Sequence, residues 1–165
     1  MGRLKTTQTD YAYIAGFLDG DGSIMAQIKK RSDTKQGWRF MFTICFYQDT
    51  GNAKPLEWIK KKLGIGCISH RKDKMTELRI NGYETIEKIL EKLKPYVKFK
   101  KEQVRCALKI LSIIKGKTLN KLTQKEREKI AEYIIALRKK NYWSHWRKYS
   151  EEEIKKIIIG SSLSP

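Results

Sequence analysis

The chain has 165 residues, of which 36 are Lys or Arg and 18 are Asp or Glu, giving a formal net charge of +18. This length fits one domain with one core, and so large a positive charge indicates a polyanionic partner, with nucleic acid ahead of a membrane surface. No apolar run approaches the roughly 20 residues that cross a bilayer, so we expect no membrane partner.

The first expected element is a helix from about Asp10 to Asp19, which Thr9 or Asp10 can cap. Its apolar residues recur at helical spacing, with the small residues Ala15 and Gly16 among them. Gly inside a helix costs about 0.5–1 kcal/mol relative to Ala, so close packing against a second helix is the better reason for its presence. We therefore expect a homodimer in which two copies of this helix meet through Ala15, Gly16 and Asp19.

Two carboxylates, Asp19 and Asp21, lie among glycines at the end of this helix. The helix macrodipole disfavours negative charge at a C-terminus, so this placement suggests a bound cation. The alternative is an apolar helix that simply ends in a Gly-rich acidic turn. Mg²⁺ prefers oxygen ligands and usually keeps several waters, so one carboxylate per protomer, with backbone carbonyls and phosphate oxygens, can hold it.

Two hairpins are expected after this helix. Polarity alternates over residues 23–30 and 38–47, which predicts two half-buried strands joined by a polar loop. A second pair of strands is expected over 66–71 and 76–80, ahead of the turn Asn81-Gly82.

Helices fill the remaining segments. Pro55 and Gly64 mark the start and stop of a short helix, and apolar stripes predict further helices over 86–93 and 104–114. Two capping boxes then open two more helices, at Thr123-x-x-Glu126 and Ser150-x-x-Glu153.

The predicted class is therefore α+β, with the order αββαββα, a four-stranded antiparallel sheet and extra C-terminal helices. We expect residues 9–115 to form the core and residues 116–165 to pack on the same domain as a helical extension.

The sheet face away from the helices is predicted to be polar and basic. Side chains of this kind can reach base edges in the major groove, although a solvated sheet face is the alternative. The residues that we expect to contact DNA are Gln27, Lys29, Arg31, Arg39, Thr43, Ser69, Arg71, Glu77 and Arg79.

Cysteine and histidine usage argues against two other kinds of site. Three widely spaced cysteines, with no C-x-x-C pair, indicate neither a disulfide framework nor a zinc site, and they favour an intracellular compartment. The two histidines, His70 and His145, lie far apart in the sequence and do not support histidine-metal nuclease chemistry.

Residues 14–22, read as I-A-G-F-L-D-G-D-G, resemble the LAGLIDADG motif of homing endonucleases. The residues that follow, Ser23-Ile24 and Gln27-Ile28-Lys29, continue as in single-motif members of that family, and the resemblance covers residues from about 11 to 114. The motif occurs once, which agrees with the expected homodimer and with a pseudo-palindromic target.

The resemblance implies an active site. It makes Asp21 the metal ligand, with the carbonyl of Gly20 beside it, and leaves Asp19 a structural role. Gln48 in Phe46-Tyr47-Gln48 matches a glutamine that positions solvent, and Lys100 in Pro95-Tyr-Val-Lys-Phe-Lys100 matches a catalytic lysine. The family often has a basic residue four positions after the glutamine. This chain has Asn52 there, with Lys54 two positions further on, and the sequence does not decide between them.

The implied activity is hydrolysis of both strands of a long DNA site by metal-activated water, leaving 3′ overhangs and promoting mobility of a host intron. Mg²⁺ is the expected cofactor, with Mn²⁺ as a substitute and Ca²⁺ supporting binding without cleavage. Two alternatives stay open: an RNA maturase, for which intron RNA is the partner, and a non-catalytic basic RNA-binding protein. The aromatic and basic segment 141–149 could pack on the body or stack on nucleic acid.

Overall fold

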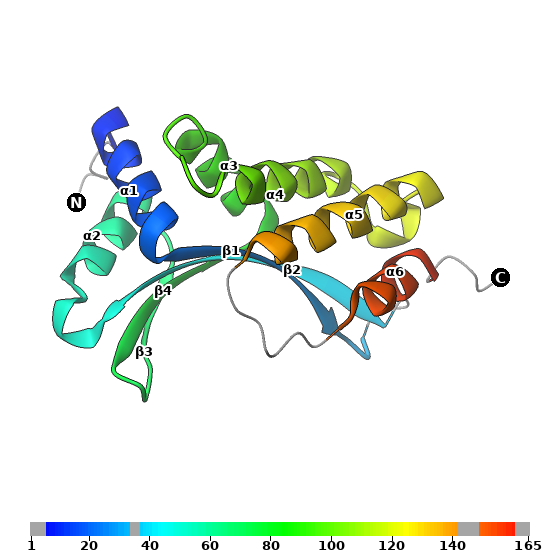
Figure 1. Ribbon diagram of the computed structural model, residues 1–165, viewed down its shortest axis with the longest axis horizontal. Helices are drawn as coiled ribbons and strands as arrows, with labels where there is room; N and C mark the ends of the chain where they lie inside the picture. Colours follow the sequence, from blue (N-terminus) through cyan, green and yellow to red (C-terminus); the bar gives the residue numbers. More distant parts are fainter. Residues whose placement is uncertain (1–5, 34–36, 142–148, 161–165) are drawn as a thin grey trace. The chain divides into compact units, whose positions relative to one another are not determined.

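A computed structural model describes residues 6–33, 37–141 and 149–160 of the chain (Figure 1). Short 3₁₀ turns occur at Thr50–Asn52 and Leu119–Lys121. The helices and strands are α1 (Gln8–Asp21), β1 (Gly22–Lys30), β2 (Trp38–Asp49), α2 (Lys54–Leu63), β3 (Cys67–His70), β4 (Met75–Asn81), α3 (Tyr83–Leu93), α4 (Lys101–Ile114), α5 (Gln124–Lys140) and α6 (Glu151–Gly160).

The strands form one four-stranded sheet in the order β1-β2-β4-β3. β4 lies between β2 and β3 and is antiparallel to both, with Phe46 opposite Leu78 and Leu78 opposite Ile68. The antiparallel sheet and the surrounding helices confirm the predicted α+β class and the predicted element order αββαββα.

The chain divides into two compact units, and β1 and β2 run through both. The first unit is Met1–Ile24 with Phe42–Lys101, and the second is Met25–Met41 with Glu102–Pro165. The predicted boundary after residue 115 does not coincide with a boundary between these units, because the second unit combines residues 25–41 with residues 102–165. How the C-terminal extension packs therefore stays a prediction.

In the first unit, α1, α2 and α3 lie on one side of the strands (Figure 1). Alternating apolar side chains of β2 and β4 point toward these helices, and Ile44, Phe46 and Leu78 are fully buried together with Leu18 of α1 and Leu90 of α3. The opposite side of the same strands carries the polar residues. Period-two patterning has thus produced one apolar and one polar sheet face.

The second unit has its own buried core, in which Ile130 of α5 and Ile158 of α6 have no exposed surface. The Arg127 guanidinium, 3% exposed, donates to the Leu122 carbonyl at 3.2 Å and to the Ile158 carbonyl at 3.0 Å. These hydrogen bonds compensate the burial of a charged group, and the second one connects α5 to α6. No helix in the described ranges has both the length and the apolar character that a membrane crossing needs.

Helix caps agree with the sequence in two places and differ in one. The boxes at Thr123 and Ser150 are present, because each hydroxyl accepts from the backbone N–H three residues later, and that residue's carboxylate accepts in return. The prediction that Thr9 or Asp10 caps α1 is wrong. The cap is Thr7, with the Asp10 side chain closing a box onto it, so α1 begins two residues earlier than expected.

Candidate functional site

The C-terminal end of α1 is fastened to the loop that follows α3. The Asp19 carboxylate, in a residue only 8% exposed, accepts three backbone N–H groups: those of Lys98 at 2.5 Å, Phe99 at 3.1 Å and Lys100 at 3.0 Å. Three donors around one carboxylate form a fixed anion cradle. The position of this loop therefore depends on Asp19, in agreement with the structural role implied for this residue.

The same contact fixes the predicted catalytic lysine. The Lys100 ammonium donates to the Asp19 carbonyl oxygen at 2.5 Å. Burial lowers the pKa of Lys100, while the charges of Asp19 and Asp21 act in the opposite direction and favour the ammonium form. Lys100 thus lies within the electrostatic field of Asp21, although 79 residues separate the two in the sequence.

Asp21 is the last residue of α1, and both Asp21 and Gly20 are exposed. The carbonyls of a final helical turn have no intrahelical donors and carry partial negative charge, so together with one carboxylate they suit a hard divalent cation. Within the described ranges, no three His, Cys, Asp or Glu side chains cluster to hold a metal. Asp21 and the carbonyls of this helix end would therefore supply only part of the ligands of a divalent cation.

Gln48 lies near the end of β2 in the same unit, half-buried and opposite Thr76 of β4. Its side-chain oxygen accepts the Asp49 N–H at 2.9 Å. Of the two candidates for the missing basic position, Asn52 is exposed in the 3₁₀ turn after β2. Lys54 begins α2 and lines a groove whose other walls are Thr9, Asp10, Tyr13, Pro55 and Trp58.

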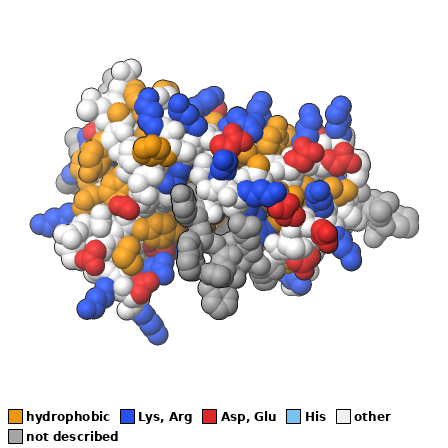
Figure 2. Space-filling view, viewed as in Figure 1, with side chains coloured by type: hydrophobic (Ala, Val, Ile, Leu, Met, Phe, Trp, Pro, Cys, Tyr) orange, Lys and Arg blue, Asp and Glu red, His pale blue; other side chains and the backbone are white. Residues whose placement is uncertain are grey.

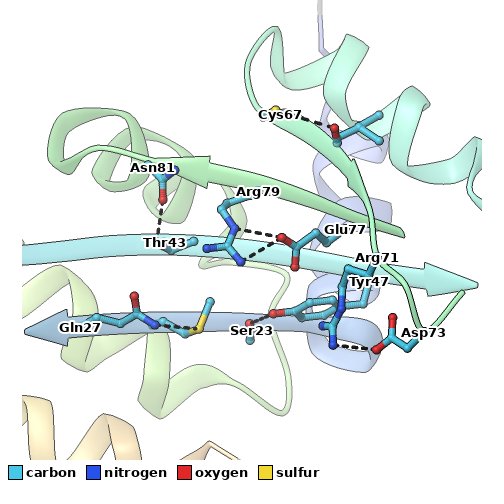
Figure 3. A network of polar contacts seen from close by, with 12 residues as sticks. Ser23, Gln27, Thr43, Tyr47, Cys67, Arg71, Asp73, Glu77, Arg79 and Asn81 are labelled. Carbon is cyan, nitrogen blue, oxygen red and sulfur yellow. Dashed lines mark hydrogen bonds and ion pairs between the residues drawn. The ribbon is translucent and has the colours of Figure 1, made fainter. Parts of the chain in front are cut away.

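The polar sheet face of the first unit forms cross-strand rows (Figure 3). Cys45, Arg79 and Cys67 form one row, and Tyr47, Glu77 and Ser69 form the next. The predicted residues Ser69, Glu77 and Arg79 thus share one face, as expected. The face is less open than predicted, because Thr43 is 1% exposed and Glu77 is 8% exposed.

Hydrogen bonds also join neighbouring strands across this face. The Thr43 hydroxyl donates to the Asn81 side-chain oxygen at 2.7 Å, and the Ser23 and Tyr47 hydroxyls lie 3.3 Å apart. Burial raises the pKa of the Tyr47 phenol, so Tyr47 stays a neutral hydroxyl on this face.

Arginines on the predicted DNA-contacting face pair with carboxylates two residues away. Arg79 donates through Nε and Nη2 to one oxygen of Glu77, at 3.2 and 2.9 Å. Arg71 pairs with Asp73 at 2.7 Å in a more exposed position near the β3–β4 turn (Figure 3). Residues two apart on a strand point to the same side, which explains the Arg79–Glu77 pair on β4, whereas Arg71 and Asp73 pair within the turn between β3 and β4.

The remaining predicted DNA contacts lie in the second unit. Gln27 is half-buried, and Lys29 and Arg39 are exposed on β1 and β2. Arg31 makes two bonds to the Asp33 carboxylate, at 2.7 and 2.6 Å, and these hydrogen bonds lower the pKa of Asp33 to about 2. Lys and Arg side chains also protrude over much of the face seen in Figure 2, with Asp and Glu between them.

The small residues predicted at a dimer interface point in different directions. Ala15 has no exposed surface and contributes to the core of the chain, so its side chain is not available to a partner. Gly16 and Gly20 are exposed, and a Cβ added at either would meet nothing within 4 Å. The open face of α1 is therefore Tyr13, Gly16 and Gly20, and Gly16 is the better placed of the two predicted small residues.

Sequence reasoning did not select Asn81, Tyr47 and Ser23, which complete the polar network of the first unit. The alternation of β2 places Tyr47 on the polar face, so that signal was available. The pairing of Asn81 with Thr43 depends on strand register, which the sequence does not specify. The predicted segment 141–149 lies outside the described residues except at its ends, where Arg138 donates to the Tyr149 carbonyl at 2.9 Å.

Comparisons with known proteins agree with this architecture. Similar curated proteins include DNA endonuclease I-CvuI of Chlorella vulgaris, 36% identical over 104 residues, and DNA endonuclease I-CreI of Chlamydomonas reinhardtii, 31% identical over 99 residues. The matches cover 63% and 60% of this chain, and 65% and 60% of those proteins. This chain therefore spans less than two thirds of the length of either relative.

Solved structures are similar over nearly the whole chain. A complex of homing endonuclease I-CvuI with its target in the presence of Ca has a TM-score of 0.74 at 26% identity, covering 96% of this chain and 98% of that one. The archaeal intron-encoded homing endonuclease I-Vdi141I, complexed with DNA, has a TM-score of 0.76 at 23% identity, covering 94% and 98%, and it shares the fold.

A family model described as LAGLIDADG endonuclease matches residues 14–105, which is more than half of the chain. The match begins at the apolar residues of α1 that precede Asp19 and Asp21, and it ends in α4 beyond Lys100. It thus contains the helix end, the sheet and the loop that together form the candidate site. The chain belongs to the LAGLIDADG endonuclease family.

Proposed function

We propose that this protein is a site-specific DNA endonuclease that cuts both strands of a long pseudo-palindromic site. The observation that supports this proposal is that Asp21 and Lys100 lie at the same end of α1. One is an exposed carboxylate at the negative end of α1, and the other is a partly buried ammonium anchored to the same helix end by the Asp19 carbonyl. A carboxylate that can bind a metal and a fixed cation at the same helix end are suited to phosphodiester hydrolysis.

Mg²⁺ fits this end of α1, and the Asp21 carboxylate and the Gly20 carbonyl would hold it. When bound, the ion would lower the pKa of a water and neutralise charge on the phosphate. Lys100 stabilises the extra negative charge that develops at the phosphate, because its ammonium is held in place by the loop that Asp19 fixes. Gln48 orients solvent from the end of β2. Mn²⁺ is proposed as a substitute, and Ca²⁺ as an ion that supports binding alone.

A homodimer follows from the single acidic helix end. Cutting two strands requires two such ends, and the open face of α1 offers a way to bring them together. Gly16 and Gly20 leave the helix backbone uncovered, and Tyr13 on the same face is 53% exposed. Phe99, in the loop next to this helix end, is 85% exposed. An apolar surface with small residues suits close packing of two copies across a two-fold axis.

The polar sheet face is the proposed DNA-contacting surface. The complex of the similar endonuclease I-CvuI with its target supports DNA as the partner. Cleavage across the minor groove with 3′ overhangs, and mobility of a host intron, are the biological consequences that we propose for this activity.

The test is incubation of the purified protein with a plasmid library of partly palindromic DNA in Mg²⁺, followed by sequencing of the cut ends. Two controls are run in parallel: Ca²⁺ in place of Mg²⁺, and Asp21→Asn in Mg²⁺. We expect site-specific double-strand breaks with 3′ overhangs in Mg²⁺ only, and DNA binding without cleavage in both controls.

Cleavage by Asp21→Asn at the rate of the unchanged protein would contradict the assignment of Asp21. Specific DNA binding without cleavage in any metal would contradict the nuclease proposal. Binding of a structured intron RNA in preference to DNA would instead support the maturase alternative.

A further inference from the structure

We infer that Glu77 is a positioning residue that aims Arg79 at a guanine, so that each half of the target contains a guanine whose recognition depends on both side chains. This inference rests on the proposed DNA-binding function. It adds a base identity and a residue that sets it, within the polar face of the first unit.

The geometry of the guanidinium carries the argument. Arg79 uses Nε and Nη2 to bond a single oxygen of Glu77, at 3.2 and 2.9 Å. That contact occupies the side edge of the planar group. The end edge, formed by Nη1 and Nη2, still presents two parallel N–H donors. Two parallel donors match the O6 and N7 acceptors of guanine in the major groove.

Burial explains how Glu77 can hold this orientation. The Glu77 side chain is 11% exposed and the Arg79 side chain is 38% exposed, so the carboxylate is the more buried of the two groups, which lie side by side on the sheet face (Figure 3). A carboxylate on a surface that meets phosphates is repelled by them, and its presence needs a compensating role. Fixing an arginine before DNA arrives is such a role, because it removes the entropy cost of ordering that side chain on binding.

The neighbours of Arg79 leave its outer edge available. The residues directly across from it on β2 and β3 are Cys45 and Cys67, which are short and uncharged. Burial raises the pKa of the Cys45 thiol, so no thiolate competes with Glu77 for the guanidinium. Within its cross-strand row, Arg79 is therefore the only long polar side chain.

Two other arginines among the predicted DNA contacts, Arg71 and Arg31, pair with carboxylates that are more exposed than that of Glu77. In the Arg71–Asp73 pair the side chains are 48% and 52% exposed, and in the Arg31–Asp33 pair they are 39% and 59% exposed. Exposed pairs contribute little and exchange readily with phosphate. We therefore assign base recognition to Arg79, and backbone contacts to Arg71 and Arg31.

The experiment is a base-by-base binding profile of the target selected by the unchanged protein, measured in Ca²⁺ for Arg79→Lys, Glu77→Ala, the isosteric Glu77→Gln, and the double variant. Glu102→Ala is the matched control. It also removes a carboxylate paired to an arginine, at 2.5 Å from Arg105, but it does so on α4, outside the sheet. Thermal unfolding of every variant verifies that it is folded.

We expect a preferred guanine at two symmetry-related positions. Arg79→Lys should lower that preference by about tenfold or more. Glu77→Ala should lower it at the same positions, with a smaller loss for Glu77→Gln. The double variant should lose no more than Arg79→Lys alone, because the two residues act as one unit. Glu102→Ala should leave the whole profile unchanged.

The experiment distinguishes failure of the proposed function from failure of the positioning role of Glu77. Absence of any sequence-selective binding by the unchanged protein would overturn the proposed function itself. Two results with selective binding would overturn the positioning role of Glu77 and leave the endonuclease proposal intact. In the first, Glu77→Ala changes the preference at all positions equally. In the second, the effects of Glu77→Ala and Arg79→Lys are additive.

Discussion

Asp19 and Asp21 have different environments because of helical geometry. Two residues along an α-helix correspond to a rotation of about 200°, so their side chains point to opposite sides. Asp19 faces the chain and accepts three N–H groups of the 98–100 loop, whereas Asp21 faces outward. The inward carboxylate organises the site, and the outward one is available to a cation and a substrate.

Replacing Asp19 should therefore affect stability more than replacing Asp21. Asp19→Asn keeps one acceptor oxygen but turns an NH₂ donor toward backbone donors, and we expect it to lower the free energy of unfolding by about 2 kcal/mol or more. Asp21→Asn, at an exposed position, should change it by about 0.5 kcal/mol or less. Urea denaturation of both variants makes the comparison, and equal losses would contradict the cradle as a source of stability.

The pKa of Lys100 gives a second test at this scale. The negative charge of Asp21 favours the ammonium form, and burial opposes it. Removing that charge in Asp21→Asn should lower the pKa of Lys100 further below the ordinary lysine value. NMR titration of the Lys100 Nζ or Cε resonance, without divalent ions, measures this shift. An unchanged or raised pKa would show that Asp21 and Lys100 are not electrostatically coupled.

At the scale of elements, α1 has two different faces. Its inner face, with Ile14, Ala15 and Leu18, is part of the core of the first unit. Its outer face, with Gly16 and Gly20, has no atoms near the missing side chains. The core therefore explains the apolar residues of this helix but not its glycines.

Gly16→Leu separates folding from association. Because a Cβ at this position meets nothing within 4 Å, the isolated chain should accept the side chain, and better helix propensity should stabilise α1 by about 0.5–1 kcal/mol. The same side chain would prevent two α1 helices from approaching closely. We expect monomers in sedimentation velocity with unfolding no easier than before, and a Gly16→Ala variant with an intermediate defect. A dimer that persists in Gly16→Leu would place the interface elsewhere.

At the scale of the whole molecule, charge governs how the protein meets DNA. A net charge of +18 predicts strong non-specific attraction whose logarithm falls linearly with the logarithm of salt concentration. Such attraction brings the protein to DNA without selecting a sequence. Selection then falls to a few placed side chains, among which we have proposed Arg79, held by the largely buried carboxylate of Glu77.

Salt titrations can assign individual cations. Lys29, exposed on β1, is predicted to contact DNA, whereas Lys88 is exposed on α3. If Lys29 meets a phosphate, Lys29→Ala should reduce the salt slope of binding by about 1, and Lys88→Ala should leave the slope unchanged. Fluorescence anisotropy on a fixed duplex across a range of salt provides the slopes. An equal effect of the two variants would argue against a DNA contact specific to Lys29.

The local sequence determined the elements and the family. Period-two alternation over 23–30 and 38–47 predicted β1 and β2, capping boxes predicted the starts of α5 and α6, and residues 14–22 identified the LAGLIDADG motif that the family model confirms. These signals are local because dihedral preferences, caps and side-chain direction act over a few residues. The predicted caps, Thr9 and Asp10, are wrong because Thr7 provides the capping hydroxyl and the Asp10 carboxylate, three residues later, completes the capping box with it.

Only the tertiary structure decided which polar groups meet. The hydrogen bonds of the Asp19 carboxylate join residues about 80 positions apart in the sequence. The pairing of Thr43 with Asn81 depends on strand register. Likewise, the sequence placed Ala15 and Gly16 together at an interface, while the structure buries one and exposes the other. Contacts over such separations are set by how the whole core packs, because shifting a strand by one residue or rotating a helix exchanges inner and outer faces.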